Sequence, residues 1–509
     1  MLYHENTRLP RECNRIRRAA RATPPRIRMS SPRSLDLDLE SMRRLGHRVA
    51  DVVAEHLASL RRQPVLTTLD RRRADELLFG PPPVHGTDFE SLLDVLRERV
   101  FAYHAREPHP RFLAYVPSCP TFPAVAGDWL ATGFNFFAGV WPVAAGPNEL
   151  EVVVLDWFRQ WIGMPAGTGG LLTTGGSAAN LTAVIAARHA AVGDDASRLP
   201  RLVMYTSDQA HSSVKRAGWI AGLPRDHIRA VPTDDELRLR ADELARMVTA
   251  DRAAGLVPFL VVASGGTTNT GAVDPLAAIA DVTARERLWL HVDAAYGGFG
   301  VLTDRGRAAL AGLGRADSVT LDPHKWLFVP FECGCLLVRR PRALAEVFRI
   351  YPEYLKDVES SGEEINFADY GEQLTRYSRA LKVWLSVNYF GTEAIAAAIE
   401  QGMELAAYTE ELVRATSGLE VLSSARFGIC CFRARPDGMS DPAVLDALNE
   451  RILNAINSSG KFFISSTRLR GAYSLRVCII SYRTTRDDIE ELIGAVARQA
   501  MEEEVQAAR

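Results

Sequence analysis

The middle of the chain alternates short apolar or β-branched runs with longer amphipathic stretches. Runs of about four to eight such residues, bounded by turn residues, are typical of buried strands. Seven runs fit this description: residues 171–174, 202–206, 230–233, 259–263, 288–293, 318–321 and 335–338. The pattern therefore predicts a sheet of seven strands.

Most of these runs are separated by stretches long enough for a crossover helix, such as residues 181–191 and 276–287. Strand–helix–strand units of this kind give parallel neighbouring strands with helices on both faces of the sheet. We therefore expect an α/β fold with a mostly parallel sheet. In such sheets ligands bind beyond the carboxyl ends of the strands, and we look for chemistry there.

The two flanks have other patterns. Apolar residues at helical spacing predict two helices, near residues 42–57 and 92–100, that form no independent core. Four further strand-like runs and two helical runs predict a small C-terminal α/β domain: 419–422, 428–432, 461–465 and 474–480, with 444–456 and 487–502. The expected organisation is an extension over 1–34, an N-terminal helical segment over 35–120, a large domain over 121–385 and a small domain over 386–509.

Composition and charge exclude several classes of protein. The 509 residues are 47% hydrophobic and 24% charged, as expected of a globular chain. Sixty Lys and Arg against 62 Asp and Glu leave a net charge of −2, which provides no overall field for nucleic acid or an anionic membrane. The seven cysteines form no C-x-x-C pair, and no signal peptide or long apolar run is present. We expect a cytoplasmic protein without nucleic acid, membrane or metal as a partner.

Residues 1–34 carry nine arginines against two glutamates and show no amphipathic stripe. We interpret them as a disordered extension, or as sequence ahead of a start at Met29. A nucleic-acid arm or a targeting peptide is the alternative, which a single basic stretch supports only weakly.

Residues 174–180, with the sequence Thr-Gly-Gly-Ser-Ala-Ala-Asn, stand between a predicted strand and a predicted helix. Small residues let the backbone approach an anion, and the first N–H groups of a helix favour negative charge. The segment lacks the ending of a P-loop and the glycine spacing of a dinucleotide fold. It is therefore a candidate phosphate cradle, although ordinary turn and cap chemistry has the same composition.

Three further side chains follow predicted strands. Asp293 ends a buried run, where a carboxylate needs a partner, and Lys325 has apolar and aromatic neighbours that favour its neutral, nucleophilic amine. His211 follows another strand. Taken alone, Asp293 also fits a residue that caps a turn, Lys325 a solvated surface residue and His211 a residue that caps a loop. Together with the cradle they supply an anion site, a partner for a pyridinium nitrogen and an amine for a Schiff base, which predicts pyridoxal 5′-phosphate (PLP) as the cofactor.

Five segments, taken in order, resemble the group II PLP decarboxylases, among them the aromatic-L-amino-acid decarboxylases (DOPA, tryptophan and tyrosine decarboxylases). The segments are residues 174–177, 207–213, 266–268, 291–296 and 322–326, and the similarity covers essentially all of the chain after residue 35. The resemblance implies the PLP-dependent transferase fold of type I. It also implies a homodimer in which two subunits build each active site.

The resemblance also implies roles for individual residues. Lys325 would bond covalently to the cofactor, Asp293 would pair with its pyridine nitrogen and His211 would stack on its ring. Further residues would surround the cofactor: Ser177, Ala178, Ala179, Thr268, Ala295, Ser318, Asp322 and His324. Asp322 stands where many members carry Asn, which leaves its hydrogen bond to the phosphate open.

Residues 348–366 resemble the mobile catalytic loop of the family, whose tyrosine delivers a proton to the substrate Cα. Tyr354 occupies that position, and related aldehyde synthases typically carry phenylalanine there, so the resemblance favours simple decarboxylation. The alternative is that Tyr351 or Tyr354 packs on the preceding helix.

The substrate pocket of the family corresponds to residues 111–118 and 133–141. Its predicted wall consists of Tyr115, Val116, Pro117, Phe137, Gly139 and Trp141. Val116 and Gly139 stand where relatives often carry aromatic residues. Arg111 and Arg476 are the only candidates to bind a side-chain carboxylate, so we expect an aromatic L-amino acid as the substrate, with a branched aliphatic one as the alternative.

Two other classes of protein remain open. An aminotransferase or aldehyde synthase of the same fold shares the lysine and aspartate pair. A non-catalytic regulator would need a helix-turn-helix module, for which the basic extension is too short and too irregular.

Overall fold

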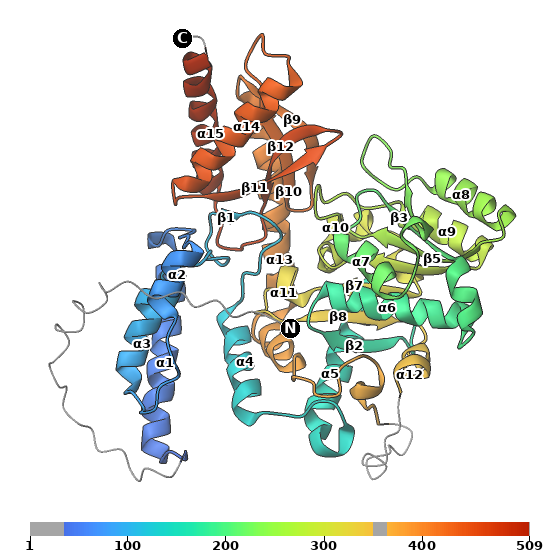
Figure 1. Cartoon of the computed structure of the whole chain (residues 1–509), viewed down its shortest axis with the longest axis horizontal. Helices are drawn as coiled ribbons and strands as arrows, with labels where there is room; N and C mark the ends of the chain where they lie inside the picture. The colour runs from blue at the N-terminus through green and yellow to red at the C-terminus, as the bar shows by residue number, and fades with distance from the viewer. Residues whose placement is uncertain (1–34, 350–363, 508–509) are drawn as a thin grey trace, which may run out of the picture. The chain divides into compact units, whose positions relative to one another are not determined.

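The computed structural model describes residues 35–349 and 364–507 of the 509-residue chain (Figure 1). Contacts divide the chain into two units, and the boundary in the sequence lies between His56 and Leu57. The first contains most of helix α1 (Leu39–Ser59), in which no residue is buried. The second unit, from Leu57 onward, contains all the other helices and strands.

The large sheet has the seven strands that the hydrophobic pattern predicts. They are β2 (Gly169–Thr173), β3 (Leu202–Ser207), β4 (Ile228–Val231), β5 (Val257–Ser264), β6 (Trp289–Asp293), β7 (Ser318–Leu321) and β8 (Gly334–Val338), in the spatial order β2-β8-β7-β6-β5-β3-β4. Strand β8 runs antiparallel to β2 and β7, and the other pairs are parallel. The predicted mostly parallel sheet is confirmed, and its interior strands carry almost only buried residues.

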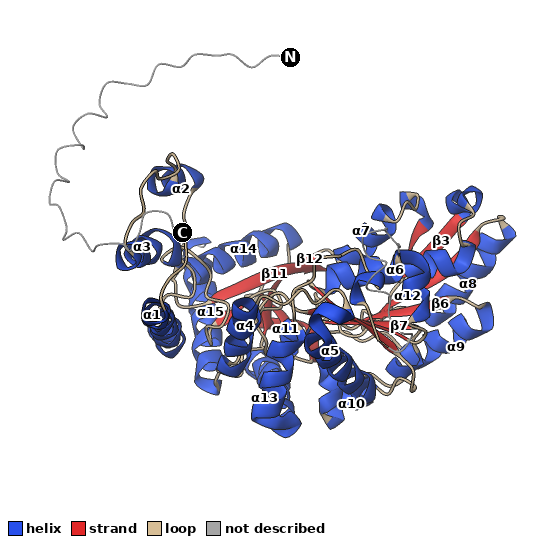
Figure 2. Ribbon diagram, turned by 90° about the horizontal axis from the view of Figure 1, so that it is seen from below, coloured by secondary structure: helices blue, strands red, loops and turns tan. Residues whose placement is uncertain are grey.

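Helices cover both faces of this sheet. Figure 2 shows α6 (Gly176–Val192) and α7 (Ser212–Ile220) on one face, and α9 (Leu276–Glu286) and α10 (Asp304–Ala309) on the other. The remaining helices of this region are α4 (Phe122–Phe134), α5 (Trp141–Ile162), α8 (Ala241–Ala253), α11 (Pro323–Trp326) and α12 (Arg342–Phe348). The expected α/β architecture, a mostly parallel sheet with helices on both faces, is therefore confirmed.

A second sheet of five strands lies in the C-terminal part. Its order is β1-β11-β12-β10-β9, from β1 (Phe112–Leu113), β9 (Leu419–Arg426), β10 (Ile429–Ala434), β11 (Phe463–Leu469) and β12 (Ala472–Cys478). Helices α14 (Pro442–Ser458) and α15 (Arg486–Ala507) accompany it, as predicted. The expected domain boundary after residue 385 falls inside α13 (Ala380–Ala415), whose helical conformation breaks at Gly391, with φ +75°.

The N-terminal flank forms short elements. Helices α2 (Arg71–Leu78) and α3 (Phe89–Leu96) begin at aspartate caps, and a π turn (Arg97–Phe101) continues α3. Short 3₁₀ turns occur at Leu60–Arg62, Ala196–Arg201, Arg225–His227, Gly298–Leu302, Leu313–Arg315 and Phe367–Asp369. Among the helices of residues 35–349 and 364–507, none combines the length and the apolar composition that a membrane span requires.

One buried ion pair joins three separate parts of the large domain. The Arg376 guanidinium lies 2.7 Å from the Glu151 carboxylate of α5, and both side chains are 1% exposed. Arg376 also donates to the carbonyls of Ala138 and Leu172, while Glu151 accepts from the amide of Leu172. The pair therefore holds α5, β2 and the chain before α13 together.

We predict that Arg376→Leu lowers the free energy of unfolding by about 3–5 kcal/mol, because it leaves the Glu151 carboxylate buried without its cation. The double variant with Glu151→Leu should lose less than Arg376→Leu alone. Urea unfolding measures both. Arg71→Leu, which breaks an exposed pair with Asp75, is the control and should have little effect. Equal losses in the single and double variants would contradict the prediction.

Candidate active site

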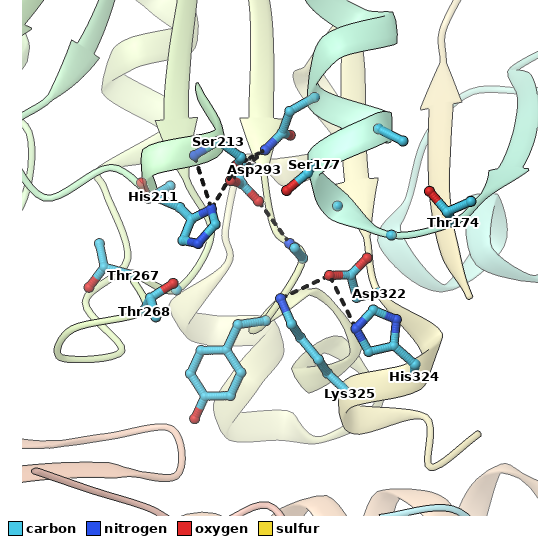
Figure 3. Close-up of a pocket in the computed structure, with 18 of the residues that line it drawn as sticks. Thr174, Ser177, His211, Ser213, Thr267, Thr268, Asp293, Asp322, His324 and Lys325 are labelled. Carbon is cyan, nitrogen blue, oxygen red and sulfur yellow. Dashed lines mark hydrogen bonds and ion pairs between the residues drawn. The ribbon is translucent and has the colours of Figure 1, made fainter. Parts of the chain in front are cut away.

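A cavity of about 340 Å³ opens at the carboxyl ends of the parallel strands. Its lining comes from the turn between β2 and α6, the start of α7, and the segments that follow β5, β6 and β7. Lys325, Asp293 and His211 all line it, although they come from three different elements (Figure 3). The structure thus brings together the three side chains that the sequence singles out.

Lys325 lies on α11, directly after β7, and its side chain is 19% exposed. Its Nζ lies 2.8 Å from Oδ2 of Asp322, which is buried. The other oxygen of Asp322, Oδ1, has no hydrogen-bond partner in the described part of the chain. The lysine amine is therefore held at the cavity by a carboxylate other than that of Asp293.

Asp293 is the last residue of β6 and is buried. Its Oδ2 accepts a hydrogen bond of 2.9 Å from Nδ2 of Asn180, and its Oδ1 accepts one of 3.2 Å from the amide of Ala295. The partner that a carboxylate needs at a buried strand end is thus an amide side chain on α6 together with the following turn. The carboxylate still lines the cavity, where it can meet a cationic ring nitrogen.

His211 caps the N-terminus of α7. Its Nδ1 lies 2.7 Å from Oγ of Ser213 and accepts a hydrogen bond from the Ser213 amide. Burial lowers the pKa of His211 and the carboxylate of Asp293 opposes this effect in part. The ring is therefore neutral at neutral pH, which suits a flat contact with an aromatic cofactor.

The start of α6 lines the cavity. A Cβ at Gly176 would lie 2.9 Å from Oδ2 of Asp322 and 3.1 Å from Cβ of Ala295, so glycine permits the close approach of these two residues to the helix start. The amides of Ala178 and Ala179 already donate to the carbonyl of Gly175. In the described residues no hydrogen bond involves the amides of Gly176 and Ser177.

Of the two predicted cofactor residues Ala178 and Ala179, Ala178 lines the cavity and Ala179 does not. The first N–H groups of a helix have no partner in the preceding turn, so the amides of Gly176 and Ser177 are available to an anion. With Lys325 and Asp293 in reach, these residues fit a phosphorylated pyridine aldehyde.

Other predicted cofactor residues divide into two groups. Thr268, Ala295, Asp322 and His324 line the cavity. Ser318 does not, because it stands at the opposite end of β7, where its Oγ bonds to the side chains of Trp289 and His291. Ser318, which was expected around the cofactor, therefore lies away from this cavity.

None of the six predicted substrate-wall residues, Tyr115, Val116, Pro117, Phe137, Gly139 and Trp141, lines the cavity within this chain. A Cβ at Gly139 would lie 2.5 Å from the carbonyl oxygen of Leu374, so this glycine permits a close backbone approach rather than an enlarged pocket. Tyr354 and Tyr351 lie outside the described residues.

Arg476 and Arg111 have structural partners. The Arg476 guanidinium is buried and donates to the carbonyls of Thr268 (2.6 Å), Tyr115 (2.7 Å) and Asn269 (3.0 Å). Arg111 pairs with Asp488 and Glu491 of α15. Arg476 therefore fixes the loop that carries Thr268 and does not face a substrate carboxylate.

Asn180 and Ser213 are among the lining residues that were not predicted as site residues. Asn180 is 1% exposed on a helix that otherwise buries mainly small and apolar residues. A polar side chain at such a position was the available signal, because a buried amide needs hydrogen-bond partners.

The fold and the site together define a PLP enzyme of fold type I. Comparison with known proteins narrows this class, because the pyridoxal-dependent decarboxylase conserved domain matches residues 82–435. The aromatic-L-amino-acid decarboxylase of Bacillus atrophaeus is 38% identical over 473 residues, which are 93% of this chain and 98% of that protein. The chain therefore belongs to the pyridoxal-dependent decarboxylase family and is a PLP-dependent amino-acid decarboxylase.

Two further similarities are informative. The phenylacetaldehyde synthase of Arabidopsis thaliana is 32% identical over 91% of this chain and 96% of its own length. The crystal structure of Oryza sativa TDC with PLP and tryptamine superposes with a TM-score of 0.88 at 30% identity, covering 93% of this chain and 99% of that one. The likeness thus extends over nearly the whole chain.

Proposed function

We propose that the protein decarboxylates an aromatic L-amino acid to the corresponding amine and CO₂. The observation that carries the proposal is the convergence of Lys325, Asp293 and the unpartnered amides of Gly176 and Ser177 on one cavity. When bound, PLP supplies an aldehyde that captures an amine and an electron-accepting ring for the electrons that CO₂ leaves behind.

The residues of this chain divide the remaining work among them. Lys325 provides the amine that holds the cofactor and that a substrate amine replaces. The Asp293 carboxylate keeps a proton on the pyridine nitrogen, because an adjacent negative charge favours the protonated ring. The amides of Gly176 and Ser177 would hold the phosphate, and the neutral ring of His211 would lie against the cofactor ring.

An aromatic substrate is favoured by the charges around the site. Among the described residues that line the cavity, Lys325 is the only Lys or Arg, and it is committed to the cofactor. Arg111 and Arg476 are engaged elsewhere, so neither of these two arginines is available for a side-chain carboxylate. The names of the similar proteins, an aromatic-L-amino-acid decarboxylase and TDC with tryptamine, support the same class of substrate.

A panel of L-amino acids tests this proposal. We expect the purified protein with PLP to form amine from tryptophan, tyrosine, DOPA or phenylalanine, detected by mass spectrometry, and to leave glutamate unchanged. Lys325→Ala should lose the visible absorbance of the bound cofactor together with amine formation. Turnover of glutamate or of branched aliphatic amino acids in preference to aromatic ones would overturn the assignment of the substrate.

Tyr354 separates decarboxylation from aldehyde formation in this proposal. The resemblance assigns it the delivery of a proton to the substrate Cα. Because the chain is also similar to phenylacetaldehyde synthase, aldehyde formation is the alternative reaction to be tested. We expect Tyr354→Phe to divert product from amine to aldehyde, measured by quantifying amine, aldehyde and CO₂. Tyr351→Phe is the matched control and should leave the ratio of products unchanged. An unaltered amine yield in Tyr354→Phe would remove Tyr354 from the mechanism.

We also propose a homodimer with shared active sites. Helices α4 and α13 pack together and expose large apolar side chains: Phe122, Trp129, Leu130, Phe134, Tyr389 and Phe390. An apolar surface of this kind typically marks a protein interface. The predicted wall over residues 133–141 adjoins this surface and does not line the cavity of its own chain, which supports a role for it in the partner's site.

Replacing Phe134, which is 70% exposed, by Asp should convert a dimer of 56.0 kDa chains into monomers in light-scattering measurements, because a charge in an apolar interface is costly. Amine formation should fall with it. Trp219→Asp, at an exposed aromatic on α7, is the control and should change neither quantity. A fully active monomer would contradict the shared site.

A further inference from the structure

Asn180 is a buried side chain that links the carboxylate of Asp293 with Ser213, the hydrogen-bond partner of His211. It is 1% exposed on α6, and its Nδ2 donates to Oδ2 of Asp293 (2.9 Å) and to Oγ of Ser213 (3.0 Å). Its Oδ1 accepts from Oγ1 of Thr320 (2.8 Å) and lies 3.0 Å from Nε2 of His291. All four hydrogen-bonding positions of the amide are thus used.

Two branches of hydrogen bonds meet at Asn180. In the first branch, the direction of every bond follows from groups that can only donate or only accept. A carboxylate accepts, so the Asn180 NH₂ faces Asp293 and its carbonyl faces His291, which must donate from Nε2. Burial lowers the pKa of His291 to about 4, so the ring is neutral and its Nδ1 accepts from the Ser318 hydroxyl at 2.8 Å.

The far end of this branch is fixed in the same way. The indole N–H of Trp289 can only donate, and it lies 2.8 Å from Oγ of Ser318. The Ser318 hydroxyl hydrogen is therefore free for His291. Donation runs without interruption from Trp289 through Ser318, His291 and Asn180 to the carboxylate of Asp293.

The second branch reaches His211. Because Oγ of Ser213 accepts from Asn180, its own hydrogen is available for Nδ1 of His211 at 2.7 Å. The amide of Ser213 also donates to Nδ1, at 3.3 Å. His211 therefore carries its proton on Nε2, the nitrogen that is not occupied by Ser213.

We propose that Asn180 is a positioning residue that orients the Asp293 carboxylate toward the pyridine nitrogen of PLP and, through Ser213, holds His211 in its Nε2–H tautomer. This inference rests on the proposed roles of Asp293 and His211. Asn180 itself touches neither substrate nor the reacting atoms in this scheme. Its side-chain NH₂ donates one hydrogen bond to Asp293 and one to the hydroxyl of Ser213, which in turn bonds to His211. An apolar residue on α6 can form neither of these bonds.

The test uses full-length protein loaded with PLP that is ¹⁵N-labelled at the pyridine nitrogen. Asn180→Leu keeps the size of the side chain and removes both donors and the acceptor. Thr182→Val is the matched control, since Thr182 is also 1% exposed on α6 but bonds only to the carbonyl of Ala178. Thermal unfolding of both variants measures the purely structural effect.

The ¹⁵N signal should show a protonated pyridine nitrogen at pH 8 in the wild type and in Thr182→Val. In Asn180→Leu it should show partial loss of that proton, with a decrease in kcat of about ten- to a hundredfold, the range expected for losing a hydrogen bond to a charged group. An unchanged ¹⁵N signal in Asn180→Leu would overturn the proposal, even if the variant unfolds at a lower temperature.

A second variant keeps the test decisive if Asn180→Leu does not fold. Ser213→Ala removes only the branch to His211, so the pyridine signal should persist while the ¹⁵N-histidine signals show loss of the fixed tautomer. Persistence of the wild-type histidine signals in Ser213→Ala would overturn the second branch. Failure of the proposed function is seen separately, as a PLP-loaded wild type that forms no amine.

Discussion

A carboxylate at the end of a strand that is buried on both faces requires hydrogen-bond donors from its surroundings, and this requirement shapes the whole site. For Asp293 the donors are the Asn180 amide on α6 and the amide of Ala295 in the following turn. The strand must therefore end where α6 passes over it. The first turn of the same helix carries the amides of Gly176 and Ser177, the proposed anion site, so this site and the acid for the ring nitrogen are held at a set separation by one helix.

The second carboxylate of the site, Asp322, illustrates how neighbouring charges are balanced. It is buried and lies close to Gly176 at the start of α6, where a negative charge opposes an incoming phosphate. The Lys325 ammonium lies 2.8 Å from its Oδ2 and offsets that charge, whereas burial lowers the pKa of the neighbouring His324, so that its ring is neutral. Aspartate in place of the asparagine of many family members thus has a partner within the same short helix.

Most of the buried arginines serve the scaffold of the site rather than its chemistry. Arg476 uses its donors on main-chain carbonyls and fixes the loop of Thr268, and Arg376 uses its donors on Glu151 and two carbonyls beside β2. Such contacts hold loops that have no regular hydrogen-bond ladder of their own. Among the described residues that line the cavity, Lys325 is the only Lys or Arg, so the site suits a phosphate, an aldehyde and a substrate without a charged side chain.

The strands, the crossover helices and the residues Lys325, Asp293 and His211 could all be predicted from the chain alone, because apolar periodicity and strand-end position are local properties of sequence. The hydrogen-bond partners of the site residues could not be predicted in this way. Which amides of the turn before α6 remain free, the location of Ser318 at the far end of β7, and the meeting of Asn180 with Asp293 all depend on elements that are distant in sequence. The sequence by itself determined the class of fold and the reactive groups, whereas only the tertiary structure decided their partners, since a hydrogen bond is set by distances and angles of a few tenths of an ångström that packing alone establishes.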